Sequence, residues 1–461
     1  MSEHFDLVVL GAGSAARDAA KRASSEHGAK VALVESTRWG GSCPNVACKP
    51  TKAYLVAAEL VHDINGLAEK IGIEVGPARL DLAGVKRRKD SLRKPQSKWV
   101  EELNAGGIAT YDGEATLVDT RTVRVGDEEL TADRILIATG SRTAVPPIEG
   151  IEEIDWLDHV SALELKELPE SMLVVGAGPV GLELGQAFAR FGTRVTIVDF
   201  VDRISPRHDR EACDELALAF DEEGIELVLS SRVRRVAREG EKFVATIEPR
   251  EGEGSSELRV TSVLLAAGRV PNVEALNLEG VGIERHKLGI TVDERLRTSV
   301  EGIWAAGDVT GMYQLTPIAQ YQARIAIADM FGQNGPTADY SILPTAIFTD
   351  PELAGVGLTE EEAKDQDLDY EVVVQPLTNV TRSQYVEAKH GLSKLIVDRE
   401  SRTVLGLHVV SRSASDVVQG FSLALKLGAT VDDVAQMHHI YPTWGEGVKA
   451  AAEQSKVPLR A

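Results

Sequence analysis

The stretch LVVLGAGSAA, residues 7–16, decides the fold of this 461-residue chain. Its four apolar residues predict a short buried strand, and the alternating glycines predict a tight turn into a helix that runs to about His27. A second strand, Lys30–Val34, follows and ends in Glu35. A strand, a glycine-rich turn, a helix and a strand with a terminal acid make up a dinucleotide-binding βαβ unit, in which Ala16 is a tolerated replacement for the third glycine.

The same pattern occurs a second time. A strand at Met172–Val175 leads into GAGPVG, residues 176–181, and a helix through Arg190 leads to the strand Arg194–Val198, which ends at Asp199. The glycines let a pyrophosphate approach the helix N-terminus, and the acid can bond a ribose hydroxyl. A doubly wound sheet without nucleotide is the alternative for either copy. One copy is weak evidence for nucleotide binding, whereas two complete copies are strong evidence.

Two of the three cysteines, Cys43 and Cys48, lie five positions apart in GGSCPNVACKPTK, residues 40–52. An undistorted helix would hold such a pair about 8–9 Å apart, and disulfides rarely form beyond roughly 7 Å. A bond therefore requires a broken first turn, which Pro44 and the two glycines can supply. A helix N-terminus also lowers the pKa of a thiol. A structural crosslink is the alternative, but so short a loop in a chain with so few cysteines favours a redox-active dithiol.

Composition limits the classes of partner. The chain is 43% hydrophobic with a net charge of −21 and has no basic stripe, which disfavours nucleic acid and anionic membranes as partners. No apolar run approaches the roughly 20 residues that span a bilayer, and residues 1–6 lack the basic start of a secretory signal. We expect a cytoplasmic protein with no nucleic-acid or membrane partner and no resident metal.

The two fingerprints and the Cys-x4-Cys helix resemble the FAD-dependent pyridine nucleotide–disulfide oxidoreductases, and the resemblance runs the whole chain. Further matching motifs are ATG at residues 138–140, AAGRVPN at 266–272, IWAAGD at 303–308 and FTDP at 348–351. The resemblance implies an α/β fold with two Rossmann-like dinucleotide-binding domains and an α+β C-terminal dimerisation domain, in an enzyme that is a homodimer with an active site shared across the interface.

The implied domains are an FAD-binding domain in two parts, residues 1–145 and 270–342, an NAD(P)H-binding domain, residues 146–269, and an interface domain, residues 343–461. In the interface domain the sequence predicts strands at Lys394–Val397 and Val404–Val410 and helices at Val417–Leu427 and Val431–Gln436.

The resemblance also implies cofactor-binding residues. For FAD they are Gly11, Gly13, Ser14, Ala15, Glu35, Gly41, Ser42, Thr139, Gly140 and Asp308. For NAD(P)H they are Gly176, Gly178, Gly181, Asp199, Gly268 and Arg269. NADH is the expected coenzyme, because a carboxylate at Asp199 bonds the ribose diol and repels a 2′-phosphate, for which Arg203 is the nearest compensating arginine.

In this family Cys48 would lie against the flavin as the charge-transfer thiolate, and Cys43 would be the interchange thiol that meets the substrate. Lys52 matches the lysine beside the reactive flavin nitrogen, and Glu183 matches its ion-pair partner. The third cysteine, Cys213, lies on an apolar-periodic helix and is expected to be a core residue.

The C-terminal segment departs from the dithiol–disulfide members. Lipoamide dehydrogenase and glutathione reductase carry a His-x-His-Pro-x4-Glu segment, whereas residues 439–446 read HIYPTWGE. Tyr441 therefore stands where those enzymes have their catalytic base, although Glu446 remains. A phenol with a pKa near 10 is a poor base at neutral pH. His439 matches the first, non-catalytic histidine, and a displaced base role for His438 or His439 is the alternative.

A tyrosine at this position is similar to mercuric reductases, which also resemble the chain at NVTR, residues 379–382, and EGVK, residues 446–449. Two thiolates suit a thiophilic metal ion without a proton shuttle. Residues 453–461, however, lack the C-terminal cysteine pair of those enzymes.

The first hypothesis is therefore an NAD(P)H oxidoreductase, mercuric reductase-like, that reduces a soft metal ion, quinone or other small acceptor. A dihydrolipoyl dehydrogenase with an altered base is the second hypothesis. A nonenzymatic flavin-bound subunit or redox sensor is the third.

Overall fold

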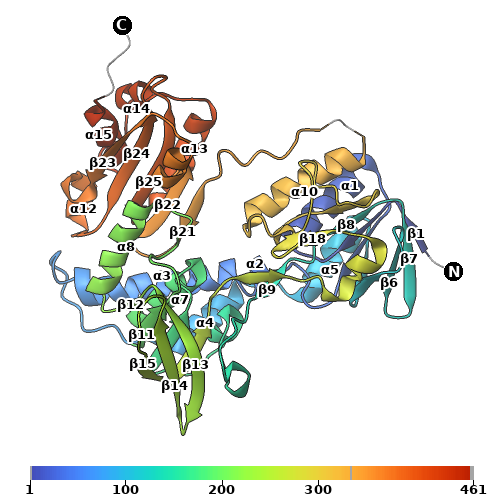
Figure 1. Cartoon of the computed structure of the whole chain (residues 1–461), viewed down its shortest axis with the longest axis horizontal. Coiled ribbons are helices and arrows are strands. Elements are labelled where there is room, and N and C mark those ends of the chain that lie inside the picture. Colours follow the sequence, from blue (N-terminus) through green and yellow to red (C-terminus); the bar gives the residue numbers. More distant parts are fainter. Residues whose placement is uncertain (1–2, 333–334, 457–461) are drawn as a thin grey trace. The chain divides into compact units, whose positions relative to one another are not determined.

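The computed structural model describes residues 3–332 and 335–456 (Figure 1). The chain folds into two compact units. The first unit consists of Met1–Pro50, Arg87–Ala144 and Gly268–Asp339. The second consists of Thr51–Lys86, Val145–Ala267 and Tyr340–Ala461. The expected nicotinamide and interface segments thus share one unit with residues 51–86, and the boundaries of the four expected segments stay predictions.

The first unit is built around a parallel sheet in the order β20-β8-β2-β3-β4. Its strands are β2 (Leu7–Leu10), β3 (Val31–Glu35), β4 (Ile108–Asp112), β8 (Ile135–Ile137) and β20 (Ile303–Ala305). Helix α1 (Ser14–His27) connects β2 to β3, as the first fingerprint predicts. The expected strand–helix–strand order and the position of Glu35 at the end of β3 are confirmed.

One face of this sheet is covered by α1 and α10 (Thr316–Met330). These helices approach each other through small side chains, because Ala16, Ala19 and Ala23 are buried in one cluster with Ala319, Ala323 and Ala326. The other face packs against a four-stranded sheet of β1 (Glu3–Phe5), β7 (Glu128–Ala132), β6 (Thr122–Val125) and β5 (Ala115–Leu117). The unit is therefore a helix layer and two sheets with an apolar core on each side of the central sheet.

The remaining elements of this unit are short or lie at its edge. They are α2 (Ser42–Asn45), α5 (Gln96–Ala105), α9 (Leu278–Val281), η3 (Glu274–Leu276), η4 (Asp308–Thr310) and the strand pairs β9 (Ser141–Thr143) with β17 (Arg269–Pro271) and β18 (Arg285–His286) with β19 (Gly289–Ile290). Helix α3 (Cys48–His62) begins at the end of one segment of this unit and continues into the second unit, as α4 (Leu82–Ser91) does in reverse.

The second unit contains the second fingerprint in a parallel sheet ordered β12-β11-β10-β16. The strands are β10 (Ser171–Val175), β11 (Arg194–Val198), β12 (Glu226–Val228) and β16 (Ser262–Leu265), and α7 (Pro179–Phe191) is the crossover helix. Other elements are α6 (His159–Ala162), α8 (Arg210–Glu222), η1 (Asp63–Leu67), η2 (Ile151–Glu153) and the antiparallel sheet β13 (Ser231–Glu239), β14 (Lys242–Pro249) and β15 (Ser256–Val260).

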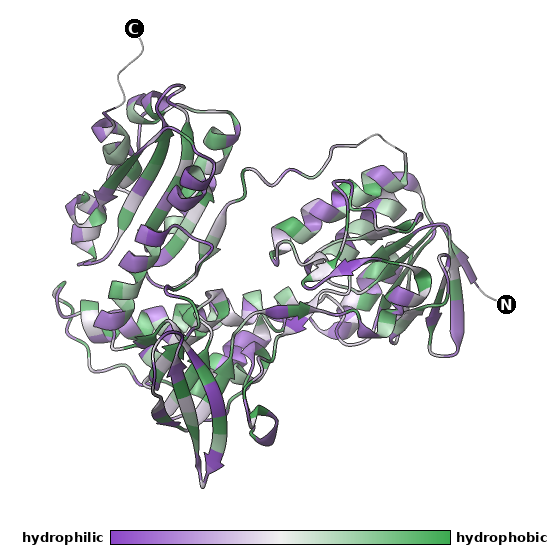
Figure 2. Cartoon of the chain, viewed as in Figure 1, coloured by the Kyte–Doolittle hydropathy of each residue, from purple (hydrophilic) through white to green (hydrophobic). Residues whose placement is uncertain are grey.

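The C-terminal part of this unit is an antiparallel sheet ordered β21-β22-β25-β24-β23 with helices against it. The strands are β21 (Thr345–Ile347), β22 (Glu352–Gly357), β23 (Tyr370–Pro376), β24 (Leu392–Asp398) and β25 (Val404–Ser411). The helical elements are α11 (Glu360–Asp365), η5 (Leu377–Asn379), α12 (Thr381–Tyr385), α13 (Ala414–Lys426), α14 (Val431–Gln436) and α15 (Glu446–Gln454). Apolar residues concentrate in these strands (Figure 2). The predicted α+β character is confirmed, with β24 and α13 each beginning earlier than expected.

Gly181 tests whether close packing at the second fingerprint stabilises its sheet. A Cβ atom on Gly181 would lie 1.9 Å from the Gly176 carbonyl oxygen, whereas one on Gly178 would meet nothing within 4 Å. We expect Gly181→Ala to lower the free energy of unfolding by about 1–3 kcal/mol, because the helix must move off the turn. Urea unfolding measures this effect, with Gly178→Ala as the matched control. Equal unfolding midpoints for the two variants would contradict the explanation.

Candidate active site

The turn of the first fingerprint requires glycine at position 11. Gly11 has φ +103°, and a Cβ atom there would lie 2.4 Å from the Ala138 carbonyl oxygen. Gly41, with φ +73°, lies so close to Gly13 that a Cβ on it would be 2.5 Å from the Gly13 Cα atom. Gly13 is the N-cap of α1 and provides no side-chain cap. The backbone N–H groups of Ser14 and Ala15 in the first helical turn therefore remain available to an anion.

Glu35 closes this turn from the end of β3. Its Oε2 atom accepts the Ala12 backbone N–H at 2.8 Å, and Oε1 accepts the backbone N–H and the hydroxyl of Thr37 at 2.8 and 2.9 Å. The carboxylate thus holds the glycine turn against the following loop. A backbone turn cleared of Cβ atoms beside uncapped helical N–H groups fits the pyrophosphate of a dinucleotide such as FAD.

Asp308 lies in a polar group near the crossover from β8. Its Oδ2 atom accepts the Ser141 hydroxyl at 2.7 Å, and Arg269 Nε donates to that same hydroxyl at 2.8 Å. Thr139 and Asn272 are joined by reciprocal side-chain to backbone bonds of 2.7 and 2.9 Å, and Gly140 has φ +70°. Gly268 and Arg269 lie in the first unit and not with the second fingerprint. Their assignment to the nicotinamide stays a prediction, because the contacts of Arg269 are with the residues expected near flavin.

The second fingerprint repeats this geometry. Gly176 has φ +112°, and a Cβ atom there would lie 2.5 Å from the Ala266 carbonyl oxygen. Gly178 is the N-cap of α7 without a side-chain cap. Asp199 accepts the Ala177 backbone N–H through Oδ2 at 2.6 Å, as Glu35 does for Ala12. The two turns therefore have equivalent geometry, one in each unit, and each would suit a phosphate group.

Arg203 forms an ion pair with Glu361. The Arg203 guanidinium donates to both carboxylate oxygens of Glu361, with 2.7 Å to Oε1, and to the Pro206 carbonyl oxygen at 3.0 Å. The arginine side chain is 11% exposed. A 2′-phosphate would have to displace this bidentate pair.

The two candidate redox cysteines lie on either side of a helix break. Cys43 is in α2, which ends at Asn45, and Cys48 is the first residue of α3. Between them Val46 has φ −139° and ψ −5°, outside helical geometry. The predicted break is confirmed, although Pro44 lies within α2 and the break follows it. Both cysteines are thiols in this structure, and Cys48 Sγ lies 4.0 Å from Thr316 Oγ1.

Lys52 and Glu183 form an ion pair within the second unit. Lys52 Nζ lies 2.8 and 2.7 Å from the two Glu183 carboxylate oxygens, and the Phe348 backbone N–H donates to Oε1 at 3.0 Å. The ammonium also lies 4.4 Å from the centre of the Phe348 ring. The Glu183 side chain is 7% exposed and that of Lys52 is 36% exposed. Glu183 and Phe348 thus fix a cation whose remaining surface is open to solvent or a ligand.

The side chains of Tyr441 and Glu446 form hydrogen bonds with different residues. Tyr441 is 67% exposed, and its hydroxyl donates to Thr381 Oγ1 at 3.2 Å. Glu446 begins α15 and accepts the Thr443 backbone N–H at 2.6 Å. His439 lies 3.1 Å from the Val434 carbonyl oxygen and stacks on Phe421. These contacts fit a structural histidine and an exposed phenol.

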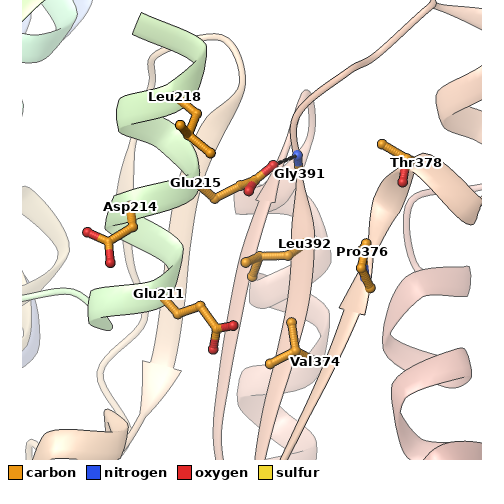
Figure 3. A pocket seen from close by; sticks show the side chains of 9 residues that line it. All are labelled: Glu211, Asp214, Glu215, Leu218, Val374, Pro376, Thr378, Gly391 and Leu392. Atoms are coloured by element: carbon orange, nitrogen blue, oxygen red, sulfur yellow. Dashed lines mark hydrogen bonds between the residues drawn. The ribbon is translucent and has the colours of Figure 1, made fainter. Parts of the chain in front are cut away.

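The described residues also form a pocket of about 240 Å³ between α8 and the strands β23 and β24 (Figure 3). Glu215 lies in its wall and accepts the Gly391 backbone N–H at 2.7 Å. None of the sequence-predicted site residues lines this pocket.

Sequence reasoning missed three supporting residues. Ser141 connects Arg269 to Asp308, and Asn45 donates to the carbonyl oxygens of Trp39 and Gly41 at 3.0 and 2.7 Å. Phe348, which the sequence marks only as part of the FTDP motif, contacts both members of the Lys52–Glu183 pair. Ser141 directly follows the ATG motif and Asn45 lies between the cysteines, so proximity to these motifs was the available signal.

Comparison with known proteins agrees with this geometry. The family model for "pyridine nucleotide-disulphide oxidoreductase" matches residues 5–323, and the model for the dimerisation domain of such proteins matches residues 343–452. A mercuric reductase from Staphylococcus aureus is 37% identical over 454 residues, covering 97% of this chain and 82% of its own. Dihydrolipoyl dehydrogenase 3 from Pseudomonas putida is 34% identical over 462 residues, covering 97% of each chain.

A solved structure, the HOCl-induced flavoprotein disulfide reductase RclA from Escherichia coli, has a TM-score of 0.87 at 28% identity. The match covers 98% of this chain and all of that one. The Cu(II) complex of the same reductase has the same TM-score and identity. Among the described residues of the present chain, no helix is both long and apolar enough to cross a membrane.

Cys213 provides a test of which thiols are accessible. It is 0% exposed, its Sγ lies 3.5 Å from the Ser205 carbonyl oxygen, and burial raises its pKa to about 12. We expect Cys213 to stay unmodified by Ellman's reagent at pH 8 until the protein is denatured, because almost none of it is thiolate. Peptide mass spectrometry of the reduced protein identifies the labelled residues, with Cys213→Ala as the control. Labelling of Cys213 as fast as Cys48 in the folded protein would contradict this prediction.

Proposed function

Because this chain belongs to the pyridine nucleotide-disulphide oxidoreductase family, we propose that it is an NAD(P)H oxidoreductase with a redox-active Cys43–Cys48 pair and a soft metal ion or other small acceptor, such as a quinone. The observation that carries the choice of acceptor is the exposed phenol of Tyr441 at the position of the family's base. Family membership itself supports a flavoprotein disulfide oxidoreductase that uses FAD and NAD(P)H.

The residues of both fingerprints suit these cofactors. Gly11, Gly13 and Gly41 clear the backbone beside the uncapped start of α1, which suits the FAD pyrophosphate. Gly176 and Gly178 do the same at α7 for the nicotinamide dinucleotide. Bound FAD supplies a two-electron relay between the nicotinamide and the cysteine pair.

Lys52 and Glu183 suit the electrostatic part of this chemistry. An ammonium held by two carboxylate contacts and a ring face cannot turn away, so its charge is fixed in place before any reaction occurs. We assign Lys52 to the stabilisation of negative charge on the reduced cofactor and Glu183 to the positioning of Lys52. Cys48, as the first residue of α3, is assigned to the cofactor side of the pair, and Cys43 to the acceptor side.

The proton requirement separates the acceptors. Reduction of a disulfide takes up two electrons and two protons, whereas reduction of Hg(II) to Hg(0) takes up two electrons and no proton. A site in which tyrosine replaces the family's proton-transferring histidine therefore suits a metal ion bound by two thiolates. Two similar proteins, a mercuric reductase and the reductase RclA, whose structure has been solved as a Cu(II) complex, support this class of acceptor.

A dihydrolipoyl dehydrogenase is the second candidate. The retained Glu446 and the 34% identical relative of that name favour it. In such an enzyme another group would have to act in place of the histidine that Tyr441 replaces, and His439 is already engaged with the Val434 carbonyl oxygen and Phe421.

The match of the dimerisation domain supports a homodimer. We propose that the exposed segment around Tyr441 completes the active site of the partner subunit, which would explain why its hydroxyl and ring remain accessible in one chain. We also propose that the enzyme works in the cytoplasm, where a dithiol can cycle.

Coenzyme preference follows from Asp199 and Arg203. The carboxylate repels a 2′-phosphate, and Glu361 neutralises the nearest arginine. We expect kcat/KM to be at least about tenfold higher for NADH than for NADPH, equivalent to about 1.4 kcal/mol. Steady-state kinetics measures the ratio, and Asp199→Asn is expected to reduce it. A wild-type enzyme that prefers NADPH would refute the assignment.

The acceptor is tested by NADH oxidation with the FAD-loaded dimer. The panel is Hg(II), Cu(II), menadione, lipoamide and glutathione disulfide. We expect metal or quinone turnover to exceed turnover of both disulfides, because metal ions and quinones need only the thiolates or the flavin, whereas a disulfide also needs a side chain that transfers protons at the cysteine pair. Efficient lipoamide turnover with poor metal turnover would move the dihydrolipoyl dehydrogenase to first place.

Tyr441→His examines the reason for that preference. A histidine at this position would supply the missing base, which typically contributes 10²–10⁴-fold, so we expect lipoamide turnover to rise by about 10². Stopped-flow reduction by NADH is expected to stay unchanged. Tyr441→Phe removes the hydroxyl bond to Thr381 without adding a base, and it should leave lipoamide turnover low. An unimproved histidine variant would show that another residue already serves as base.

A further inference from the structure

Arg17 occupies an unusual position for a charged side chain. It lies in the first turns of α1, where its backbone N–H donates to the Gly13 carbonyl oxygen at 3.0 Å. Its guanidinium stacks 4.3 Å from the centre of the Trp99 ring, and its Nε atom is buried without a hydrogen-bond partner. A cation in this position is partly removed from water, and its Nε atom has no hydrogen-bond acceptor in place of water. This arrangement costs free energy unless a nearby anion offsets the lost hydration.

The loop that leads to Cys43 packs against the Trp99 ring and the start of α1. A Cβ atom on Gly40 would lie 2.6 Å from the Trp99 ring, and one on Gly41 would lie 2.5 Å from the Gly13 Cα atom. Asn45, two residues after Cys43, donates to the Gly41 carbonyl oxygen at 2.7 Å and receives a bond from Gln96 at 3.2 Å. Trp99 therefore contacts both the Arg17 guanidinium and the loop that precedes Cys43, and the start of α1 packs against the same loop.

The neighbouring acids are already paired with other cations. Asp18 accepts Arg22 Nε at 2.9 Å and lies 3.5 Å from Arg324, and Glu102 is paired with Lys94. Lys94 Nζ also lies 4.0 Å from the centre of the Trp99 ring. The hydrogen bond from Lys94, together with the positive charge of Lys21, lowers the pKa of Glu102. Burial lowers the pKa of Arg17, and the Cys43 thiolate is the largest opposing influence on it, ahead of Glu102 and Asp18. This attraction acts equally on both partners, so it stabilises the thiolate as much as the guanidinium.

We propose that Arg17 is a positioning residue that holds Cys43 as a thiolate in place of the base that Tyr441 cannot provide. The inference rests on the proposed function, because it gives Cys43 the role of meeting the acceptor. A permanent cation differs from a histidine in that it favours the thiolate without carrying a proton to or from a substrate. It therefore prepares Cys43 to bind a metal ion but not to complete the proton transfers of disulfide turnover.

The test is the pH profile of Cys43 alkylation in the FAD-loaded protein. A Cys48→Ser background keeps Cys43 as a thiol, and peptide mass spectrometry follows its reaction with iodoacetamide from pH 5 to 10. We expect Arg17→Gln to raise the midpoint by about one pH unit, which lowers the thiolate population at pH 6 about tenfold. The alkylation rate at that pH should fall less, about threefold, because a more basic thiolate is the stronger nucleophile. Arg17→Lys retains the charge and should keep the midpoint near that of the parent.

Lys98→Gln is the matched control. Lys98 lies on α5 one residue from Trp99, pairs with Glu101 at 2.8 Å and is 60% exposed, so its loss changes the net charge equally without removing the cation at Cys43. Arg17→Met, which retains apolar packing on Trp99, repeats the test if the glutamine variant loses FAD.

An unchanged midpoint in a folded, FAD-bound Arg17 variant would overturn the inference, as would an equal shift in Lys98→Gln. These outcomes are independent of the proposed function. Alkylation needs no acceptor, whereas failure of the metal and quinone assays beside a normal midpoint shift would reject the proposed acceptor alone.

Discussion

Close approach of a glycine to a neighbouring backbone is the constraint on which both proposed nucleotide sites depend. Gly11 packs on the carbonyl of Ala138, Gly176 packs on that of Ala266, and Gly41 packs on Gly13. Each contact brings a loop that follows one strand against a loop from elsewhere in the chain. The helix N-terminus, the terminal acid and the cysteine loop then take positions that follow from these contacts, because no side chain separates them.

The second requirement is that charges near the site be fixed by partners. Glu183 is buried, and a buried carboxylate is stable only if its oxygens are satisfied, which Lys52 and the Phe348 N–H accomplish together. Arg203 is fixed by Glu361 in the same way. Charged side chains near the proposed site thus form specific ion pairs. These pairings fix the position of each charge, which the net charge of the chain does not do.

Much of the fold could be predicted because its signals are local. The strands β2, β3, β10 and β11, the helices between them, Glu35 and Asp199 all belong to short patterns whose spacing follows from βαβ geometry. The helix break between Cys43 and Cys48 was also predictable, since disulfide geometry excludes a regular helix. Contacts between distant segments were not predictable in this way. Arg269 joins Ser141 across 128 positions, and Arg17 meets Trp99 across a segment of no recognisable pattern.

The alanine contact between α1 and α10 has a consequence for how this sequence can change. Ala16, Ala19, Ala23, Ala319, Ala323 and Ala326 share one cluster, so neither helix has volume to spare where they meet. A larger side chain at any of these positions would push α1 away from the sheet and move the turn that begins it. Substitutions in α1 are therefore expected to be tolerated mainly on its outward face, where Lys21 and Arg22 lie, because changes there leave the glycine turn in place.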